Sequence, residues 1–246
     1  MSTDVKITVI TIVKNGERTI ERAIRSILPQ LNEEIEYLVI DGNSTDSTLE
    51  IVNQFSKEIN LIISEPDTGI YNAMNKGISI AKGNLIGFLN CDDEYAPGAL
   101  KIILNSAASV HAGIYHGDTE YVASNGSTSI KRPGPIENIT GDPTINHTTC
   151  FVTKQTYQQQ GDFDEKYKIS SDFDLMLRCY LKGVRFHYIP QTLNKFYWGG
   201  ASSKCYSNVE GYRILKHHKT GKHLSLIPRM IKCYTKNFIK LVIGRF

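Results

Sequence analysis

Residues 6–13 read Lys-Ile-Thr-Val-Ile-Thr-Ile-Val, a run in which β-branched residues predominate and the apolar character is nearly continuous. Such a run is typical of a strand that is buried on both faces of a parallel sheet. Lys14-Asn15-Gly16 interrupts it, and between Glu17 and Pro29 the apolar residues recur at helical spacing. A strand, a short loop and a helix in this order form the first unit of an α/β fold.

The same unit recurs along the first part of the chain. Strand patterns at 35–40, 60–64 and 84–89 alternate with helix patterns at 47–55 and 70–81. Successive units of this kind predict a mostly parallel sheet joined by right-handed crossovers. We expect ligands at the carboxyl ends of its strands, because the loops and helix N-termini at that edge present free N–H groups.

The pattern changes after Pro97. Asn125-Gly126 is typical of a hairpin turn, and a loop rich in Pro and Gly follows at 133–143. No linker or internal repeat separates a second domain, so we expect α+β elements added to the same sheet. These predicted elements are strands at 113–123, 128–131, 148–153 and 185–189 and a helix at 172–182.

Length and composition indicate one globular domain. We place it at residues 1–210 of the 246, with two halves that meet near residue 110. Hydrophobic residues make up 41% and charged residues 22%, which suffices for a packed core. The five cysteines include no Cys-x-x-Cys pair, and no apolar run approaches the roughly 20 residues that span a bilayer. With no signal peptide pattern at the N-terminus, these features predict a cytoplasmic protein.

Acidic residues stand where other α/β proteins carry Gly-rich motifs. The chain has no G-x-G-x-x-G after its first strand, no G-x-x-x-x-G-K-[ST] and no G-x-S-x-G. Asp41 follows the second predicted strand, and Asp92-Asp93 follow the fourth, so the sheet brings them to one edge. A hard divalent cation such as Mg2+ offsets the repulsion between adjacent carboxylates. The alternative is that the pair caps a helix near residues 96–105.

A second acidic group begins the predicted helix at 172–182. Asp172 and Asp174 can act as helix caps, or one of them can serve as a general base. Residues two apart on a helix point in different directions, so only one of them can be the base.

Four stretches of the sequence resemble the family 2 glycosyltransferases of the GT-A fold. They are Thr8–Asn15, Val39–Asp46, Ser64–Gly77 (Ser-Glu-Pro-Asp-Thr-Gly-Ile-Tyr-Asn-Ala-Met-Asn-Lys-Gly) and Phe88–Asp93. Their order, spacing and place at strand ends match across about residues 5–200. The resemblance implies transfer of a sugar, with inversion at its anomeric carbon, from a nucleotide-sugar donor, with a preference for UDP.

The resemblance also implies roles for residues of the first half. Thr11 and Asp41 hold the nucleobase, whereas Asp92 and Asp93 contact the ribose and bind Mg2+ or Mn2+ on the diphosphate. Many members carry Asp-x-Asp-Asp at the last of these places, but this chain has Asn90 at the first position. We therefore leave the metal ligand open between Asp92 and Asp93, with Asp93 favoured.

In the second half, the resemblance assigns the catalytic base to Asp172, with Asp174 as the less favoured choice. His147 matches a histidine that contacts the leaving phosphate or the acceptor, although a lone histidine before a strand is often structural. Residues 198–203, Trp-Gly-Gly-Ala-Ser-Ser, resemble a segment that closes over the substrates, or they mark a turn. The implied acceptor is a glycan or a polyprenyl-diphosphate-linked sugar of surface polysaccharide synthesis.

The C-terminal tail, residues 211–246, is strongly basic. It holds nine Lys/Arg and no Asp or Glu, which leaves 19 Lys/Arg against 25 Asp/Glu in residues 1–210. The pattern of residues 224–246 predicts an amphipathic helix. This helix either lies on an anionic membrane or packs on the body of the protein. The tail has too few aromatic residues to favour nucleic acid as its partner. The predicted apolar face comprises Ile227, Met230, Ile231, Tyr234, Phe238, Leu241 and Val242, and the basic face Arg229, Lys232, Lys236 and Lys240.

Two other functions remain open at this point. A nucleotidyltransferase of similar fold requires basic residues at a triphosphate, and the first loop offers only Lys14 and Arg18. A non-catalytic protein that binds a nucleotide sugar or acts as a scaffold is the other alternative.

Overall fold

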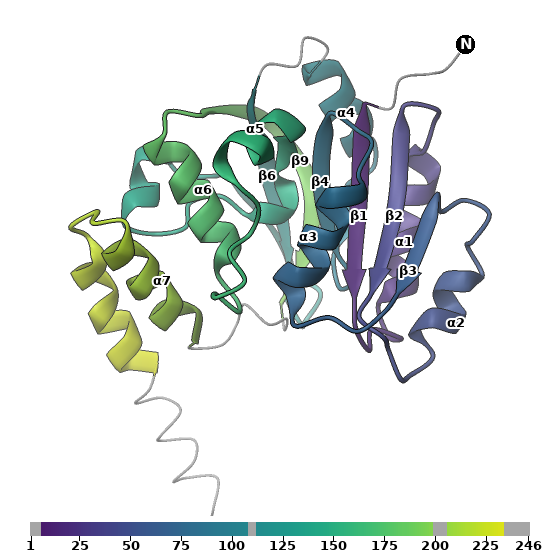
Figure 1. Ribbon diagram of the computed structural model, residues 1–246, viewed down its shortest axis with the longest axis horizontal. Helices are drawn as coiled ribbons and strands as arrows, with labels where there is room; N and C mark the ends of the chain where they lie inside the picture. The colour runs from purple at the N-terminus through teal and green to yellow at the C-terminus, as the bar shows by residue number, and fades with distance from the viewer. Residues whose placement is uncertain (1–5, 108–111, 199–205, 234–246) are drawn as a thin grey trace, which may run out of the picture.

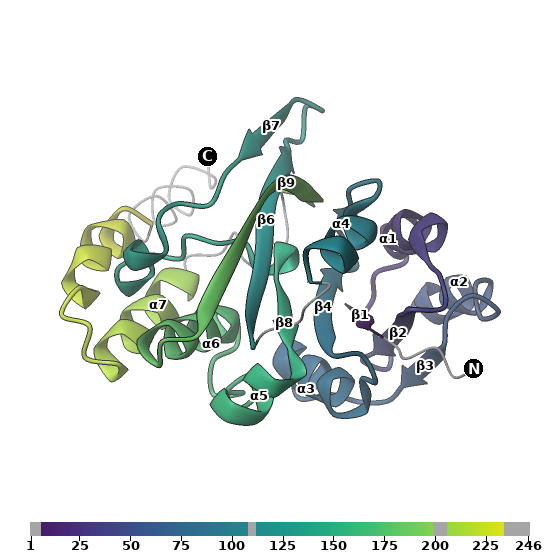
Figure 2. The same ribbon diagram turned by 90° about the horizontal axis from the view of Figure 1, so that it is seen from above.

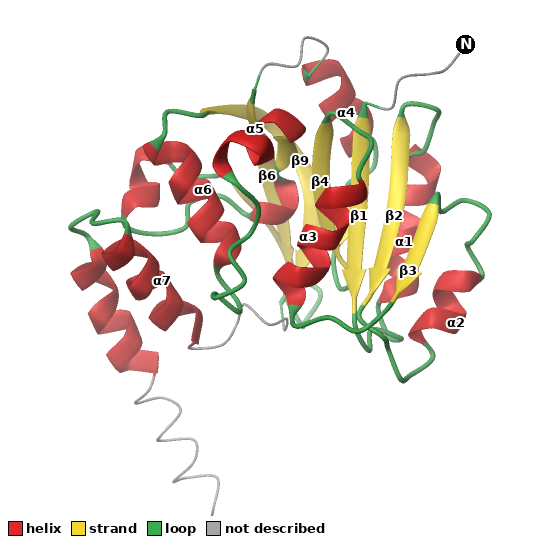
Figure 3. Cartoon of the chain, in the orientation of Figure 1, coloured by secondary structure: helices red, strands yellow, loops and turns green. Residues whose placement is uncertain are grey.

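The computed structural model describes residues 6–107, 112–198 and 206–233. Its centre is a curled nine-stranded sheet in the order β3-β2-β1-β4-β8-β6-β9-β5, with β7 paired to β6. Helices cover both faces of this sheet (Figure 1, Figure 3). The sheet therefore sets the framework for every segment described below.

The first four strands pair in parallel, as predicted. Thr11 of β1 pairs with Val39 of β2 and Leu89 of β4, so the carboxyl ends of these strands meet at one edge. The strands are β1 (Ile7–Val13), β2 (Ile35–Asp41), β3 (Leu61–Ser64) and β4 (Leu85–Asn90). The helices of this half are α1 (Ile20–Ile27), α2 (Thr48–Asn53), α3 (Ile70–Ile80) and α4 (Ala99–Ser106).

The second half adds antiparallel and parallel pairs to the same sheet. β8 runs antiparallel to β4 and β6, whereas β9 runs parallel to β6 (Figure 2). The short β5 links the end of β4 back to β9. These strands are β5 (Glu94–Tyr95), β6 (Gly113–Val122), β7 (Thr128–Lys131), β8 (Phe151–Thr153) and β9 (Arg185–Tyr197). The helices are α5 (Lys154–Gln160), α6 (Ser171–Leu181) and α7 (Tyr206–His217).

In the second half, two predicted strand bounds are wrong and one helix was not predicted. The strand expected at 148–153 begins only at Phe151, because the Asn146 side chain accepts the Thr148 N–H and winds His147–Thr149 into a 3-10 turn. Helix α5 was not predicted; it follows directly on β8 and is capped by the Thr153 hydroxyl. β9 continues past Pro190 to Tyr197, since the register with β6 shifts there and a bulge accommodates the proline.

Apolar side chains of β1 alternate between two cores. Ile10 and Ile12 face the core beneath α3, α5, α6 and α7, whereas Ile7, Val9 and Val13 face the core beneath α1, α2 and α4. Figure 1 shows α3 in front of the sheet and α1 behind it. Because both faces are covered, the strand ends are where polar side chains of this half can reach a ligand.

The packed body of the protein continues beyond residue 210, where the sequence analysis placed the start of the tail. α7 runs across that boundary, and Ile214 and Leu215 are fully buried. A helix begins at Ile227, with Pro228 in its first turn, and continues to Cys233, where the described residues end. Most of the predicted amphipathic face lies outside the described residues. None of the helices within the described ranges is long and apolar enough to cross a membrane.

Candidate active site

A cavity of about 780 Å3 opens at the carboxyl ends of β1 and β4. Both halves of the chain line it: Lys14, Asn15 and Gly16 come from the loop after β1, and His147 and Asp172 come from the second half. The cavity thus lies at the edge where the sequence predicted ligands.

The loops after β1 and β2 are joined by hydrogen bonds. The Asn15 N–H donates to Ser44 Oγ at 2.8 Å, the Thr45 N–H donates to Asn15 Oδ1 at 2.9 Å, and the Gly16 N–H donates to Thr48 Oγ1 at 2.8 Å. Asn15 and Asn43 have φ values of 53° and 60°, in the left-handed region that asparagine tolerates. These contacts fix one wall of the cavity before any ligand binds.

Thr11 and Asp41, the predicted nucleobase contacts, do not line the cavity. Thr11 is fully buried, and its hydroxyl accepts a hydrogen bond of 3.1 Å from the hydroxyl of Tyr37. Asp41 is also fully buried and accepts hydrogen bonds from the Ser44 N–H and hydroxyl and from the Ser64 hydroxyl, the last at 2.6 Å. In this structure Asp41 anchors the loop that holds Asn15, and direct contact of either residue with a base stays a prediction.

The two adjacent aspartates have different surroundings. Asp92 lines the cavity, whereas Asp93 is 1% exposed and accepts hydrogen bonds from the Tyr197 N–H at 3.1 Å and from Asn90 Nδ2 at 3.3 Å. Burial, together with the charge of Asp92, raises the pKa of Asp93 to about 7. The alternative that this pair caps the next helix is wrong, since Gly98 precedes α4 and no side chain caps it. Of the two, Asp92 is therefore placed to meet a ligand.

Asp172 lies at the start of α6, with its carboxylate held between two donors. Its Oδ2 is 3.1 Å from His147 Nδ1, and its Oδ1 accepts a hydrogen bond of 2.8 Å from the Tyr71 hydroxyl. Burial raises the pKa of Asp172, but the charge and hydrogen bond of His147 and the hydrogen bond of Tyr71 outweigh it, so the net shift is downward. Burial lowers the pKa of His147, but the charge and hydrogen bond of Asp172, together with the charges of Asp93 and Asp92, outweigh it, so the net shift is upward. The cavity therefore contains a carboxylate that stays ionised at neutral pH.

Asp174, the other candidate base, points away from the cavity. It is 2% exposed, and its carboxylate contacts Arg178 Nε and His218 Nε2, each at 2.8 Å. The Arg178 contact lies within α6, and the His218 contact joins α6 to the residue that follows α7. Of the two predicted candidates, only Asp172 faces the cavity.

Four buried polar atoms on cavity-lining side chains have no hydrogen-bond partner within the described residues. They are Asn90 Oδ1, Thr144 Oγ1, Asn146 Nδ2 and His147 Nε2. Asn90 Oδ1 and the Asp92 carboxylate are hard oxygen donors, the type that Mg2+ and Mn2+ prefer. In the part of the chain that the structure describes, no three or more His, Cys, Asp or Glu side chains come together in a way that could hold a metal ion by themselves. The donor set fits a cation that takes one or two protein ligands and completes its shell with substrate oxygens.

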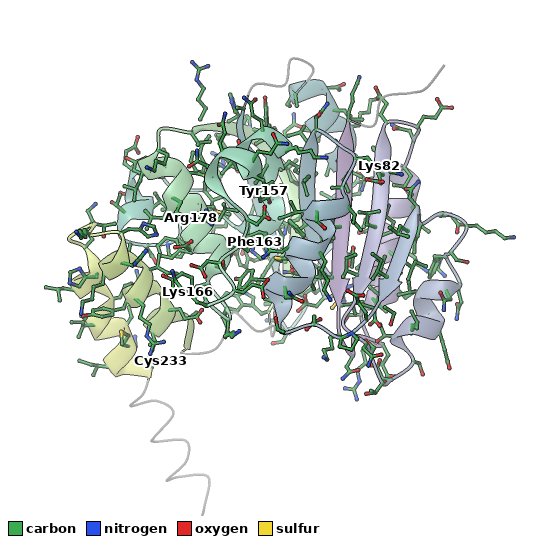
Figure 4. The ribbon with its side chains drawn as sticks, in the orientation of Figure 1. Lys82, Tyr157, Phe163, Lys166, Arg178 and Cys233 are labelled. Atoms are coloured by element: carbon green, nitrogen blue, oxygen red, sulfur yellow. The ribbon has the colours of Figure 1, made fainter. Side chains whose placement is uncertain are left out.

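Two residues that support Asp172 were not singled out by the sequence. Tyr71 lies within the quoted stretch Ser64–Gly77, so a signal for it existed. Its ring packs on Phe163 with 5.3 Å between ring centroids, and Figure 4 shows Phe163 and Tyr157 in the interior near α6. The packing holds the Tyr71 hydroxyl towards Asp172.

Glu210 is the second residue that sequence reasoning missed. This α7 side chain is 1% exposed and accepts the backbone N–H groups of Lys168, Ile169 and Ser170 at 2.6, 2.8 and 2.9 Å. The three residues line the cavity and immediately precede α6. The only sequence signal was that Glu210 is the last acidic residue of the chain.

Comparisons with known proteins show which family this chain resembles. The family model described as glycosyl transferase family 2 matches residues 8–164. A PGL/p-HBAD biosynthesis glycosyltransferase of Mycobacterium bovis is 26% identical over 200 residues, covering 77% of this chain and 76% of the relative. Glycosyltransferase GlyA of Streptococcus pneumoniae is 32% identical over 126 residues, covering 49% of this chain and 18% of the relative.

Among solved structures, S. aureus TarS 1–349 in complex with UDP-GlcNAc is similar, with a TM-score of 0.69 and 20% identity. The match covers 85% of this chain and 64% of the TarS chain, so this chain spans less than two thirds of that length. The likeness shows a shared fold and confirms the GT-A architecture that the sequence predicted. Because the family model matches more than half of this chain, the chain belongs to glycosyl transferase family 2.

Proposed function

We propose that this protein is an inverting glycosyltransferase that takes a sugar from a nucleoside diphosphate sugar, with UDP as the preferred nucleotide. The observation that carries the proposal is the Asp172 carboxylate, which lies between His147 and Tyr71 in the same cavity as Asp92. A related fold supports the choice of donor, because TarS was crystallised with UDP-GlcNAc and with UDP.

Asp172 is proposed to act as the general base. Its lowered pKa keeps it ionised at neutral pH, and it accepts the proton of the acceptor hydroxyl as that oxygen attacks the anomeric carbon. A single displacement of this kind inverts the anomeric centre and needs no covalent nucleophile on the protein. Tyr71 and His147 fix both carboxylate oxygens, so the proton-accepting group is oriented before substrate binds.

Asp92 and Asn90 are proposed to hold a divalent cation at the donor diphosphate, with His147 Nε2 facing the same space. A bound Mg2+ or Mn2+ neutralises the charge that develops on the departing diphosphate. Asp93 is proposed to position Asn90 without contacting the cation, since its carboxylate accepts hydrogen bonds from Asn90 and from the backbone of β9.

The reaction is tested by comparing Asp172→Asn with wild type. We expect turnover of UDP-sugars, screened with and without Mn2+, to fall by about 1,000-fold or more, while the thermal shift caused by the donor is kept. Asp164→Asn, the same change at a partly exposed aspartate that does not line the cavity, is the matched control. Equal turnover in the Asp172 and Asp164 variants would contradict the assignment of the base and favour a scaffold or another base.

We also propose that the acceptor is a glycan or a lipid-linked sugar and that the protein attaches peripherally to the cytoplasmic face of a membrane. Three apolar side chains near the described end of the tail are well exposed: Leu224 at 59%, Ile227 at 37% and Ile231 at 59%. Arg229 of the same helix pairs with Asp142 at 2.7 Å, which ties the start of this helix to the body. Basic side chains near an anionic surface each add about 1 kcal/mol of binding.

Membrane attachment is tested by sedimentation with vesicles. We expect the full chain to bind phosphatidylserine-containing vesicles at low salt and to be released at high salt, because the attraction is screened. A chain that ends after Gly221 is the comparison. Binding that is equal with and without residues 222–246, or no binding to anionic vesicles at all, would contradict this attachment.

A further inference from the structure

Three aromatic side chains gather where β6 and β9 end. Phe196 and Trp198 are two residues apart on β9 and its continuation, and Tyr121 of β6 pairs with Phe196 in the sheet register. The centroid of the Tyr121 ring lies 5.2 Å from that of Phe196 and 5.8 Å from that of Trp198. The Phe196 and Trp198 centroids are 6.1 Å apart. Trp198 is nevertheless 61% exposed. Large aromatic rings in mutual contact yet open to solvent are typical of a binding surface.

This aromatic cluster borders the proposed catalytic site. Tyr121 and Phe196 line the same cavity as Asp172. The intervening residue, Tyr197, donates its backbone N–H to Asp93 at 3.1 Å, which ties the end of β9 to the acidic pair. Burial and then the charge of Asp93 raise the pKa of Tyr121, in agreement with this proximity.

The strands that carry the cluster are separated in the sheet from those that precede the first wall of the cavity. The rings come from β6, β9 and the residue after β9, and β4 and β8 lie between these strands and β1, whose following loop supplies Lys14–Gly16. A donor whose diphosphate lies at Asp92 would have its nucleoside towards that first wall. In that arrangement the donor does not cover the three rings, so they are free to contact the acceptor.

The neighbours of the rings are polar and positively charged. Lys131 Nζ lies 5.6 Å from the centre of the Tyr121 ring, and Thr119 and Arg132 line the cavity beside it. A hydrocarbon chain gains most from an enclosed apolar slot, whereas a sugar presents a C–H face to an aromatic ring and hydroxyl groups to polar neighbours. An open ring surface with polar surroundings therefore fits a sugar better than a lipid chain.

We propose that Tyr121, Phe196 and Trp198 form a platform on which a pyranose ring of the acceptor stacks, so that the acceptor recognised by this cavity is a glycan. The proposal rests on the proposed glycosyl transfer, because it assigns the acceptor of that reaction. The platform places the glycan with a hydroxyl near Asp172 and leaves the rest of the acceptor outside the cavity.

The chain itself supplies the probe, since Trp198 is its only tryptophan. Intrinsic fluorescence is followed while maltotriose, cellotriose or chitotriose is added to the full chain in the presence of UDP and Mg2+, with decyl phosphate as the lipid-phosphate comparison. We expect a saturable change with at least one trisaccharide and none with decyl phosphate. Phe196→Ala and Tyr121→Ala should weaken that binding about tenfold or more, and Tyr121→Phe should restore it.

Ile130→Ala is the matched control, since Ile130 is 65% exposed on β7 and does not line the cavity. It should change the trisaccharide affinity less than about twofold. A response to decyl phosphate alone, no response to any trisaccharide, or equal loss in the Ile130 variant would overturn the platform. Circular dichroism melts of the alanine variants separate lost binding from lost folding.

Kinetics give a second, independent readout. Trp198→Ala should raise the KM for a glycan acceptor about tenfold or more with a smaller effect on kcat, and Trp198→Phe should recover most of the loss. A loss confined to kcat would overturn the platform. If the wild-type chain consumed no UDP-sugar under any condition, the proposed function would fail, while the fluorescence titration would still decide whether the rings bind sugar.

Discussion

The two halves of the molecule position their cavity residues in different ways. In the first half, Lys14–Gly16 and Asp92 follow directly on parallel strands, so the topology of the sheet brings them to one edge. In the second half, Asp172 depends on side chains from other elements, and its partner Tyr71 is 101 residues away. Strand topology, together with hydrogen bonds between the adjacent loops after β1 and β2, thus places the proposed donor wall, whereas side chains from both halves of the chain hold the proposed base.

Removal of the Glu210 carboxylate is expected to cause the largest losses of stability and of kcat, because Glu210 supports the loop that leads to the proposed base. Glu210→Ala leaves three backbone N–H groups of the loop before α6 without their carboxylate partner. Hydrogen bonds to a charged group contribute about 1.5–3 kcal/mol, so we expect the free energy of unfolding to fall by about 3 kcal/mol or more. Because this loop leads into α6, kcat should also fall about tenfold or more under conditions where the variant is folded. Urea unfolding and steady-state kinetics measure the two effects.

Glu36 of the first half provides a matched control. It is 4% exposed and accepts hydrogen bonds from the Thr8 hydroxyl at 2.7 Å and the Lys82 N–H at 2.9 Å, at the sheet edge opposite the cavity. In Glu36→Ala the free energy of unfolding should fall by about 2–3 kcal/mol, close to the loss in the Glu210 variant, but kcat should stay unchanged. If both variants lost kcat equally, the distinction between the halves would not hold for catalysis.

An intermediate effect is expected at Asp93, which joins the two halves through the Tyr197 N–H. Its pKa is about 7 in the folded protein, against about 3.9 in an unfolded chain. The folded state therefore binds an extra proton between these values, and this group's contribution to stability falls as pH rises from about 4 to about 7. Asp93→Asn keeps an acceptor for Tyr197 without the charge.

We expect Asp93→Asn to be more stable than wild type by about 1–3 kcal/mol at pH 8, with the difference vanishing below about pH 4. Thermal unfolding of both proteins across this range, without added metal, measures it. A difference that is the same at pH 4 and pH 8 would contradict the raised pKa.

The contrast between the halves also explains which features the sequence could predict. Strand ends such as Val13 and Asn90 follow from local apolar runs, so the edge that bears Asp92 was foreseeable. Local patterns could not show that Asp93, rather than Asp92, turns into the interior, because its partner Tyr197 is 104 residues away. The proline at 190 concealed the second part of β9 for a similar reason, since the bulge that accommodates it is formed with β6.

The smallest of the expected effects concerns the hydroxyl of Tyr71, which joins α3 of the first half to Asp172. Tyr71→Phe removes this hydrogen bond but keeps the ring on Phe163, so the free energy of unfolding should change by about 1 kcal/mol or less. The hydrogen bond lowers the pKa of Asp172, and its loss should move the acidic limb of the pH profile of kcat/KM to higher pH. Tyr188→Phe, which removes a 2.7 Å hydrogen bond to Asp118 outside the cavity, should leave that limb in place. An acidic limb that stays fixed in the Tyr71 variant would mean that His147 alone sets the proton affinity of the base, and that the first half contributes no side chain to its control.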